Sequence, residues 1–150
     1  MSDEIKQYQS EIEELQAKVS SLEQSLKKLA ILVEPNPKYP YWHKILCLGI
    51  NEEQRMNLEY IMSYLTSRLH QDEEFLQHDA EQSSRFPPEL FRKEKPSADE
   101  TINIIIASCG IGYEKIVKDI LICMYQQGMF KQIISFLFPV ETSNVQKVEE

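Results

Sequence analysis

The sequence "IKQYQSEIEELQAKVSSLEQSLKKLAILV", residues 5–33, decides the fold of the first part of this 150-residue chain. Apolar residues recur in it every seven positions, and a second series follows the first at a distance of three residues. The first series, at the a positions of a heptad, is Ile5, Ile12, Val19, Leu26 and Val33; the second, at the d positions, is Tyr8, Leu15, Leu22 and Leu29. A pattern sustained over about four heptads predicts a coiled-coil oligomerisation helix, here over residues 1–34.

The residue types at these positions favour a parallel dimer. Most a positions are β-branched and most d positions are leucine, which is the combination typical of two strands, and Lys18 at g can pair with Glu23 at e of a second chain. Leu26 at a and Tyr8 at d weaken this preference, so a trimer is the alternative. A different alternative is that the helix folds back on its own chain. An isolated helix would leave its apolar stripe in water, so some partner is expected.

A second part of the chain begins after "EPNPKYP", residues 34–40, because three prolines in seven residues end the helix. Tyr39, Tyr41 and the only tryptophan, Trp42, follow at once. Tyrosine and tryptophan have large apolar rings with a polar group at one end, which suits a partly solvated junction between the N-terminal helix and a globular body. We therefore interpret these three residues as packing residues. An aromatic ligand-binding box is the alternative.

Residues 39–138 predict a multihelical domain, and the whole chain is therefore expected to be all-α. A short helix from Trp42 to Leu48 should close at Gly49, and Asn51 with Gln54 has the spacing of a capping box that opens a long third helix. One apolar face of that helix recurs at helical spacing and comprises Leu58, Ile61, Met62, Leu65, Leu69 and Leu76. A second stripe, Met56, Tyr60 and Tyr64, is a candidate partner-binding surface.

A polar connection with internal prolines occupies residues 79–97 and is expected to be a mobile linker. Its small apolar island, Phe86, Leu90 and Phe91, is a second candidate for binding a protein partner. Ser97 and Glu100 predict another capping box and a buried helix after it. Two more helices should follow, one ending near Gly128 and one ending at Pro139, and residues 139–150 should form a loose polar tail.

The domain resembles the YhaI-like family of small helical proteins of Gram-positive bacteria. The resemblance covers roughly residues 30–138 and rests on "YPY" at residues 39–41, on Gly49, on "NEEQ" at residues 51–54 and on "ILICMYQQGMFKQIISFLF" at residues 120–138. It implies a compact multihelical domain. It implies no activity, because the family is a domain of unknown function. The linker at 79–97 and the long first helix depart from the family pattern.

Composition and charge narrow the classes of partner. The net charge is −8, which repels phosphate and makes nucleic-acid binding unlikely, although a DNA-binding regulator stays as a second alternative. The N-terminus carries no export signal, and no apolar run reaches the roughly 20 residues that span a bilayer, so a cytoplasmic protein without membrane contact is expected. Three cysteines without CxxC spacing suit reduced thiols.

Two groups of residues could carry chemistry. His70, Glu74 and His78 are spaced by four, so a continuous helix would place them on one side as a possible metal face, and His43 with Cys47 could form an activated thiol. We interpret the first group as a solvated helix face and Cys47 as a buried, inert thiol. The sequence therefore predicts no catalytic residue, metal site or cofactor. It favours a non-enzymatic interaction or regulatory protein, with a metal-dependent or thiol enzyme as the alternative.

Overall fold

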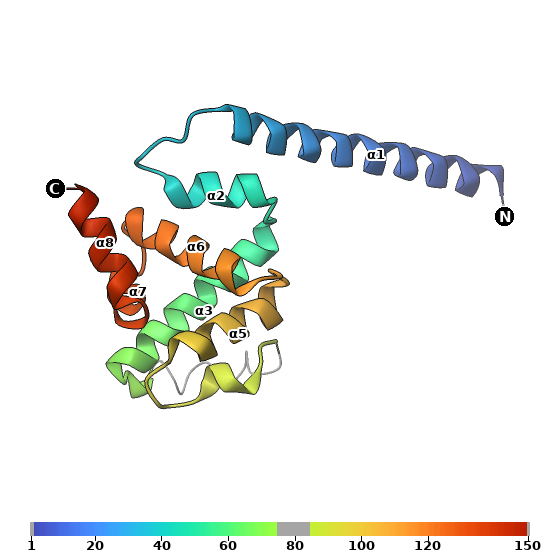
Figure 1. Ribbon diagram of the computed structural model, residues 1–150. Helices are drawn as coiled ribbons and strands as arrows, with labels where there is room; N and C mark the ends of the chain where they lie inside the picture. Colours follow the sequence, from blue (N-terminus) through green and yellow to red (C-terminus); the bar gives the residue numbers. More distant parts are fainter. Residues whose placement is uncertain (1, 75–84, 150) are drawn as a thin grey trace.

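The computed structural model describes residues 2–74 and 85–149, and these residues form helices and connecting segments without a strand. A long N-terminal helix is followed by a compact helical body, which confirms the all-α architecture (Figure 1). The described helices are α1 (Asp3–Leu32), α2 (Pro40–Leu48), α3 (Glu52–His70), the 3-10 helix η2 (Pro88–Phe91), α5 (Ala98–Cys109), α6 (Glu114–Gln126), α7 (Lys131–Leu137) and α8 (Pro139–Glu149).

Helix α1 extends well beyond the body, and only its C-terminal part lies beside another helix (Figure 1). It begins at Ser2, whose side chain accepts a hydrogen bond from the Ile5 amide at 3.4 Å. After the proline-rich turn, α2 runs back antiparallel to the last turns of α1 (Figure 1). The chain therefore forms a helical hairpin of unequal arms, in which the longer arm projects into solvent.

Helix α2 is capped at both of its ends, and the first cap comes from the body. Its first amides, those of Tyr41 and Trp42, donate to Oε1 of Gln127 at 2.9 and 3.2 Å, so a side chain that follows α6 caps α2. At the other end Gly49 adopts a left-handed conformation with φ 66°, which L-residues disfavour, and closes the helix as expected. Tyr41 is fully buried between α2 and the body, whereas Tyr39 and Trp42 stay exposed.

The core lies between α3, α5, α6 and α7, and α2 and α8 cover its outer sides (Figure 1). The predicted apolar face of α3 supplies Leu58, Ile61, Met62 and Leu65 to it, all of them fully buried. Both predicted capping boxes are present, Asn51 with Gln54 at the start of α3 and Ser97 with Glu100 at the start of α5. Because each capping box pairs side chains with amides three residues away, the local sequence is enough to predict these helix starts.

Helix α3 is shorter than the sequence pattern predicts. It ends at His70, and Gln71 closes it in a left-handed conformation with φ 55°. The expectation of one continuous helix through Leu76 is therefore wrong at Gln71 and Asp72, and Leu76 itself lies outside the described residues. Because Gln71 is not a glycine, the sequence gives no indication that the backbone becomes left-handed there and ends the helix.

The C-terminal segment also differs from the prediction. Pro139 does end α7, but it also occupies the first turn of α8, a position that suits proline because the amide there has no partner within the helix. Two contacts hold α8 to α6: Gln146 Nε2 donates to the Tyr125 hydroxyl at 2.6 Å, and Lys118 pairs with Glu141 at 2.7 Å. The tail that was expected to be loose is thus a docked helix.

Candidate interaction surface

The nine residues at the a and d positions of α1 form one exposed apolar stripe, which we call the seam. Each of them keeps between 46% and 64% of its side chain accessible: Ile5, Tyr8, Ile12, Leu15, Val19, Leu22, Leu26, Leu29 and Val33. Within the described part of the chain, α2 is the helix that lies beside α1 (Figure 1). The exposed fractions show that it leaves the seam uncovered. Folding back on the chain's own body therefore does not satisfy the seam.

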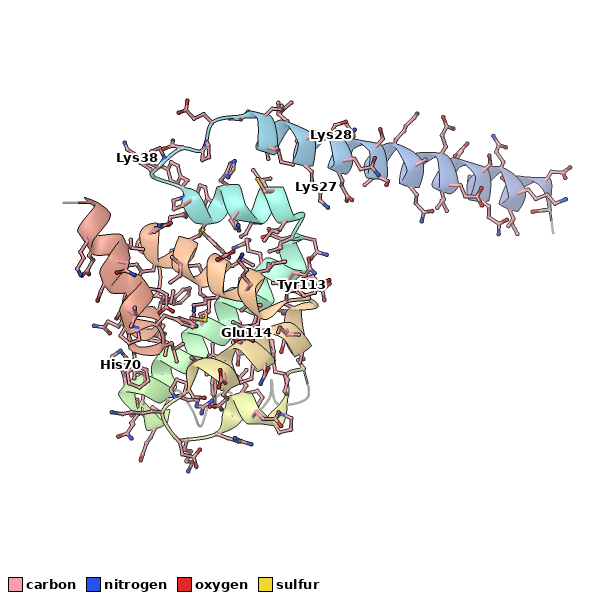
Figure 2. The ribbon with its side chains drawn as sticks, in the orientation of Figure 1. Lys27, Lys28, Lys38, His70, Tyr113 and Glu114 are labelled. Carbon is pink, nitrogen blue, oxygen red and sulfur yellow. The ribbon has the colours of Figure 1, made fainter. Side chains whose placement is uncertain are left out.

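A different flank of α1 contacts the body. Ala30 is the buried residue of α1, and its carbonyl accepts a hydrogen bond from Nε2 of His43 on α2 at 2.8 Å. One turn earlier, Lys27 lies on the side of α1 that faces α2 (Figure 2), with its chain passing over Gly49 so closely that a Cβ there would meet Lys27 Cε at 2.0 Å. At 3.6 residues per turn this flank is about 100° around α1 from the seam.

Helix α2 carries a second exposed apolar stripe. Trp42 and Leu46, four residues apart, keep about half of their side chains accessible, and Tyr39 stacks on Trp42 with ring centroids 5.1 Å apart. Leu46 also lines the cleft between α1 and α2 together with Leu26 of the seam. Leu26 and Leu46 thus bring the two apolar stripes to the same cleft, whose lining also includes Glu23, Gln24 and Lys27.

The residues proposed from the sequence to bind a protein partner mostly cover one another. Tyr60 stacks on Phe86 at 4.9 Å between ring centroids, and Tyr64 meets Phe91 edge-to-face at 5.1 Å. Tyr64, Phe86 and Leu90 are buried, and Tyr60 and Phe91 are half-buried. Met56 is the member of this set that remains well exposed. It lines a hollow together with Glu52, Glu53, Asn57, Tyr60, Arg85 and Phe86.

Arg68 fastens the segment around η2 to the body, a role that the sequence interpretation missed. Its side chain is only 1% exposed. Three of its N–H groups donate to main-chain carbonyls: Nε to Glu94 at 3.0 Å, and Nη1 to Glu89 at 3.1 Å and to Leu90 at 3.2 Å. Nη2 pairs with the Glu100 carboxylate at 3.0 Å. Arg68 follows Leu65 by three residues, so the helical period already placed it on the buried face.

The hydrogen bonds from Arg68 hold part of the segment 79–97, which the sequence predicts to be a mobile linker. Its described part, residues 85–97, contains η2, buries Phe86 and Leu90, and accepts all three main-chain bonds from Arg68. Residues 79–84 lie outside the described residues. Residues 85–97 are therefore packed against the body, and the mobility of the linker stays a prediction.

The possible metal face is not assembled by the described residues. His70 ends α3, the non-helical residues Gln71 and Asp72 separate it from Glu74, and His78 lies outside the described residues. Among the described residues, no three or more His, Cys, Asp or Glu side chains lie where they could hold a metal ion together.

The possible thiol site is assembled but poorly aligned. A carbonyl only accepts, so the bond to Ala30 places the proton of His43 on Nε2 and leaves the lone pair on Nδ1. Sγ of Cys47 lies 3.7 Å from both ring nitrogens. A point equally distant from both nitrogens does not lie along the Nδ1 lone pair, which points outward in the ring plane. The geometry therefore does not favour proton transfer from the thiol.

Burial raises the pKa values of the other two cysteines and of the buried tyrosine. Desolvation raises the pKa of the Cys109 thiol to about 11 and raises the pKa of Cys123 as well. The pKa of Tyr41 is raised well above its usual range, chiefly by burial and then by the nearby Glu59 carboxylate. These groups stay protonated at neutral pH, which suits packing.

No protein-family model, curated protein or solved structure matches the chain. The resemblance to the YhaI-like family stays a prediction. Of the helices that the structure describes, none combines the length and the apolar character needed to cross a membrane.

Proposed function

We propose that this chain is a non-enzymatic interaction protein that forms a homodimer through the seam of α1 and presents its helical body to a protein partner. The observation that carries the proposal is the exposure of all nine seam residues on a helix whose other flank is anchored to the body. An apolar stripe nearly 30 residues long exceeds what monomeric proteins usually leave in water.

The energetics support a second copy as the occupant of the seam. Fully burying a Leu, Ile or Val side chain is worth about 1.5–3 kcal/mol. The seam supplies nine such positions in each chain, including one tyrosine, and two copies in register would bury their a and d residues against each other. Even after the cost of association, which is on the order of 4–15 kcal/mol, a favourable balance remains.

The same proposal includes a basic partner for the body. The net charge of −8 steers a positively charged protein toward the chain. The hollow around Met56 is lined by apolar side chains, Met56, Tyr60 and Phe86, and by the charged residues Glu52, Glu53 and Arg85, of which Glu52 already pairs with Arg55. This lining fits a partner segment that places an apolar side chain in the hollow and a basic residue beside Glu53. A cytoplasmic location belongs to the proposal.

The test of self-association charges the centre of the seam. Leu15→Glu with Leu22→Glu places two like charges per chain across the interface and removes two buried leucines, so the dimer should dissociate by several orders of magnitude more readily. Light scattering should report a monomer, and the far-ultraviolet helical signal should fall only by the share of α1.

The matched control is Ser10→Glu with Ala17→Glu, which adds the same charge on the face of α1 opposite the seam, where both residues are exposed. This variant should keep the mass of the dimer. Retention of the dimer mass by the Leu15→Glu/Leu22→Glu variant would show that α1 is not the interface.

A further inference from the structure

We propose that the dimer interface does not end with the seam: in a parallel dimer, Trp42 and Leu46 on α2 of each copy cover Leu32 of the other copy. The two α1–α2 pairs would then form a collar of four helices at the end of the rod nearest the bodies. This inference rests on the proposed self-association and adds the orientation of the two chains and a second contact between them.

The first step is that the two apolar stripes open on the same side. His43 marks the line where α2 meets α1, through its bond to the Ala30 carbonyl. Leu26 on α1 and Leu46 on α2 line one cleft, of about 410 Å³, between the helices. A helix that packs on the seam beside Leu26 therefore also passes over Leu46 and its neighbour Trp42.

The second step is the position of Leu32. It is 82% exposed, and it lies at a g position, outside the seam. In a parallel coiled coil the g flank of one chain faces the e flank of the other. The e flank of α1 is the one occupied by Ala30, where α2 docks. The partner's Leu32 is thereby brought to the side on which α2 stands.

The third step is the level of these residues along the rod. Because α2 runs antiparallel to α1 and His43 is level with Ala30, Trp42 is level with residues 31–32 of α1. In an in-register parallel dimer the partner's Leu32 sits at that same height. Tyr39, stacked on Trp42, would close the contact from the far side.

An antiparallel dimer makes a poorer match. With the two α1 helices fully overlapped, the partner residues that pass over Trp42 and Leu46 come from its N-terminal turns, and the flank that faces α2 carries Lys6 and Gln9. That arrangement would cover an apolar stripe with polar side chains and leave Leu32 in water. The parallel arrangement covers both.

Trp42 is the only tryptophan of the chain, so its fluorescence reports this contact directly. We would compare the wild-type chain with the Leu15→Glu/Leu22→Glu variant, with light scattering on the same samples. The expected result is a dimer whose emission is shifted to the blue and whose acrylamide quenching constant is at least about twofold lower than in the monomeric variant, since the core of an interface excludes solvent.

A second variant locates the contact. Leu32→Asp should return the emission and quenching of Trp42 toward the monomer values while the seam keeps the dimer mass. Its matched control is Ile31→Asp, an equally drastic change of an exposed residue on another flank of α1, which should leave Trp42 covered.

Three results would overturn the collar. A dimer in which Trp42 emits and is quenched as in the monomer would remove it and leave self-association intact. Unchanged Trp42 fluorescence in dimeric Leu32→Asp would do the same. A wild-type chain that is monomeric by light scattering would refute self-association itself, and the collar with it.

Discussion

At the scale of single residues, Arg68 connects segments that are distant in the sequence. Its guanidinium contacts carbonyls 21 to 26 residues away and a carboxylate 32 residues away. A buried guanidinium is costly unless its donors are satisfied, and here four of the five N–H bonds are accounted for. Arg68 thus ties η2 and the start of α5 to α3.

Replacing Arg68 should therefore be severe. Arg68→Met keeps the apolar length but leaves the Glu100 carboxylate and three carbonyls without their donor, and we expect a loss of about 3 kcal/mol in the free energy of unfolding. Urea denaturation measures it. Arg55→Met is the matched control, because Arg55 pairs with Glu52 and Glu59 near the surface and should cost less than about 1 kcal/mol. Equal losses in the two variants would contradict the role given to Arg68.

Burial of Cys109 predicts a dependence of stability on alkaline pH. The pKa of this thiol rises from an ordinary value of 9.0 to about 11 in the folded chain. The unfolded chain therefore loses the proton first as pH rises, and stability should fall above pH 9, by about 1 kcal/mol between pH 8 and pH 10. Denaturation of the wild-type chain and of Cys109→Ala at both values checks this. Identical falls in both proteins would exclude Cys109 as the cause.

Residue-level prediction from sequence succeeded where the partners are close along the chain. The capping pairs Asn51/Gln54 and Ser97/Glu100 act over three residues, and the left-handed closure at Gly49 needs only the glycine. Arg68 and Gln127 act over tens of residues. The sequence can indicate that Arg68 is buried and that Gln127 is able to cap a helix. It cannot indicate which groups they contact, because the tertiary fold determines those contacts.

At the scale of elements, the ends of helices were harder to predict than their cores. The apolar period found the buried face of α3 but carried it past His70, because Gln71 is an unusual residue for a left-handed cap. Pro139 indicated the end of α7 correctly and concealed the start of α8, since proline suits both roles. The stabilising contacts of α8, to Tyr125 and Lys118, lie on another helix.

The packed part of the linker gives a prediction for amide exchange. The Leu90 amide donates to the Pro87 carbonyl at 3.1 Å, and Leu90 is fully buried under the guanidinium of Arg68. Its exchange should be protected in the wild-type chain and should accelerate in Arg68→Met more than exchange within α6 does. Hydrogen–deuterium exchange with mass spectrometry resolves the segment. Wild-type exchange of Leu90 as fast as that of an unstructured peptide would show that the packing of residues 85–97 does not persist in solution.

At the scale of the whole molecule, the periodicity of α1 predicted the seam, and the structure leaves that seam exposed. What periodicity could not predict is the docking of α1 on α2 through Ala30, Lys27 and Gly49, because that contact involves one small residue, one flexible chain and one glycine. For the same reason the cleft that Leu26 and Leu46 share emerged only from the fold. The two halves of the candidate partner-binding set cover each other in part, which periodicity could not predict because the paired rings are more than 25 residues apart in the sequence; their role in binding stays a prediction.

The central claim is that α1 joins two copies of this chain, and the mass of the unmodified protein in solution tests it most directly. Sedimentation equilibrium of the full chain across a range of concentrations should give twice the chain mass of 17.6 kDa. Dilution should lower that mass toward a single chain through one reversible step. A mass of one chain at every concentration would contradict the account, and a mass of three chains would replace the dimer with the trimer that the a and d residues also allow.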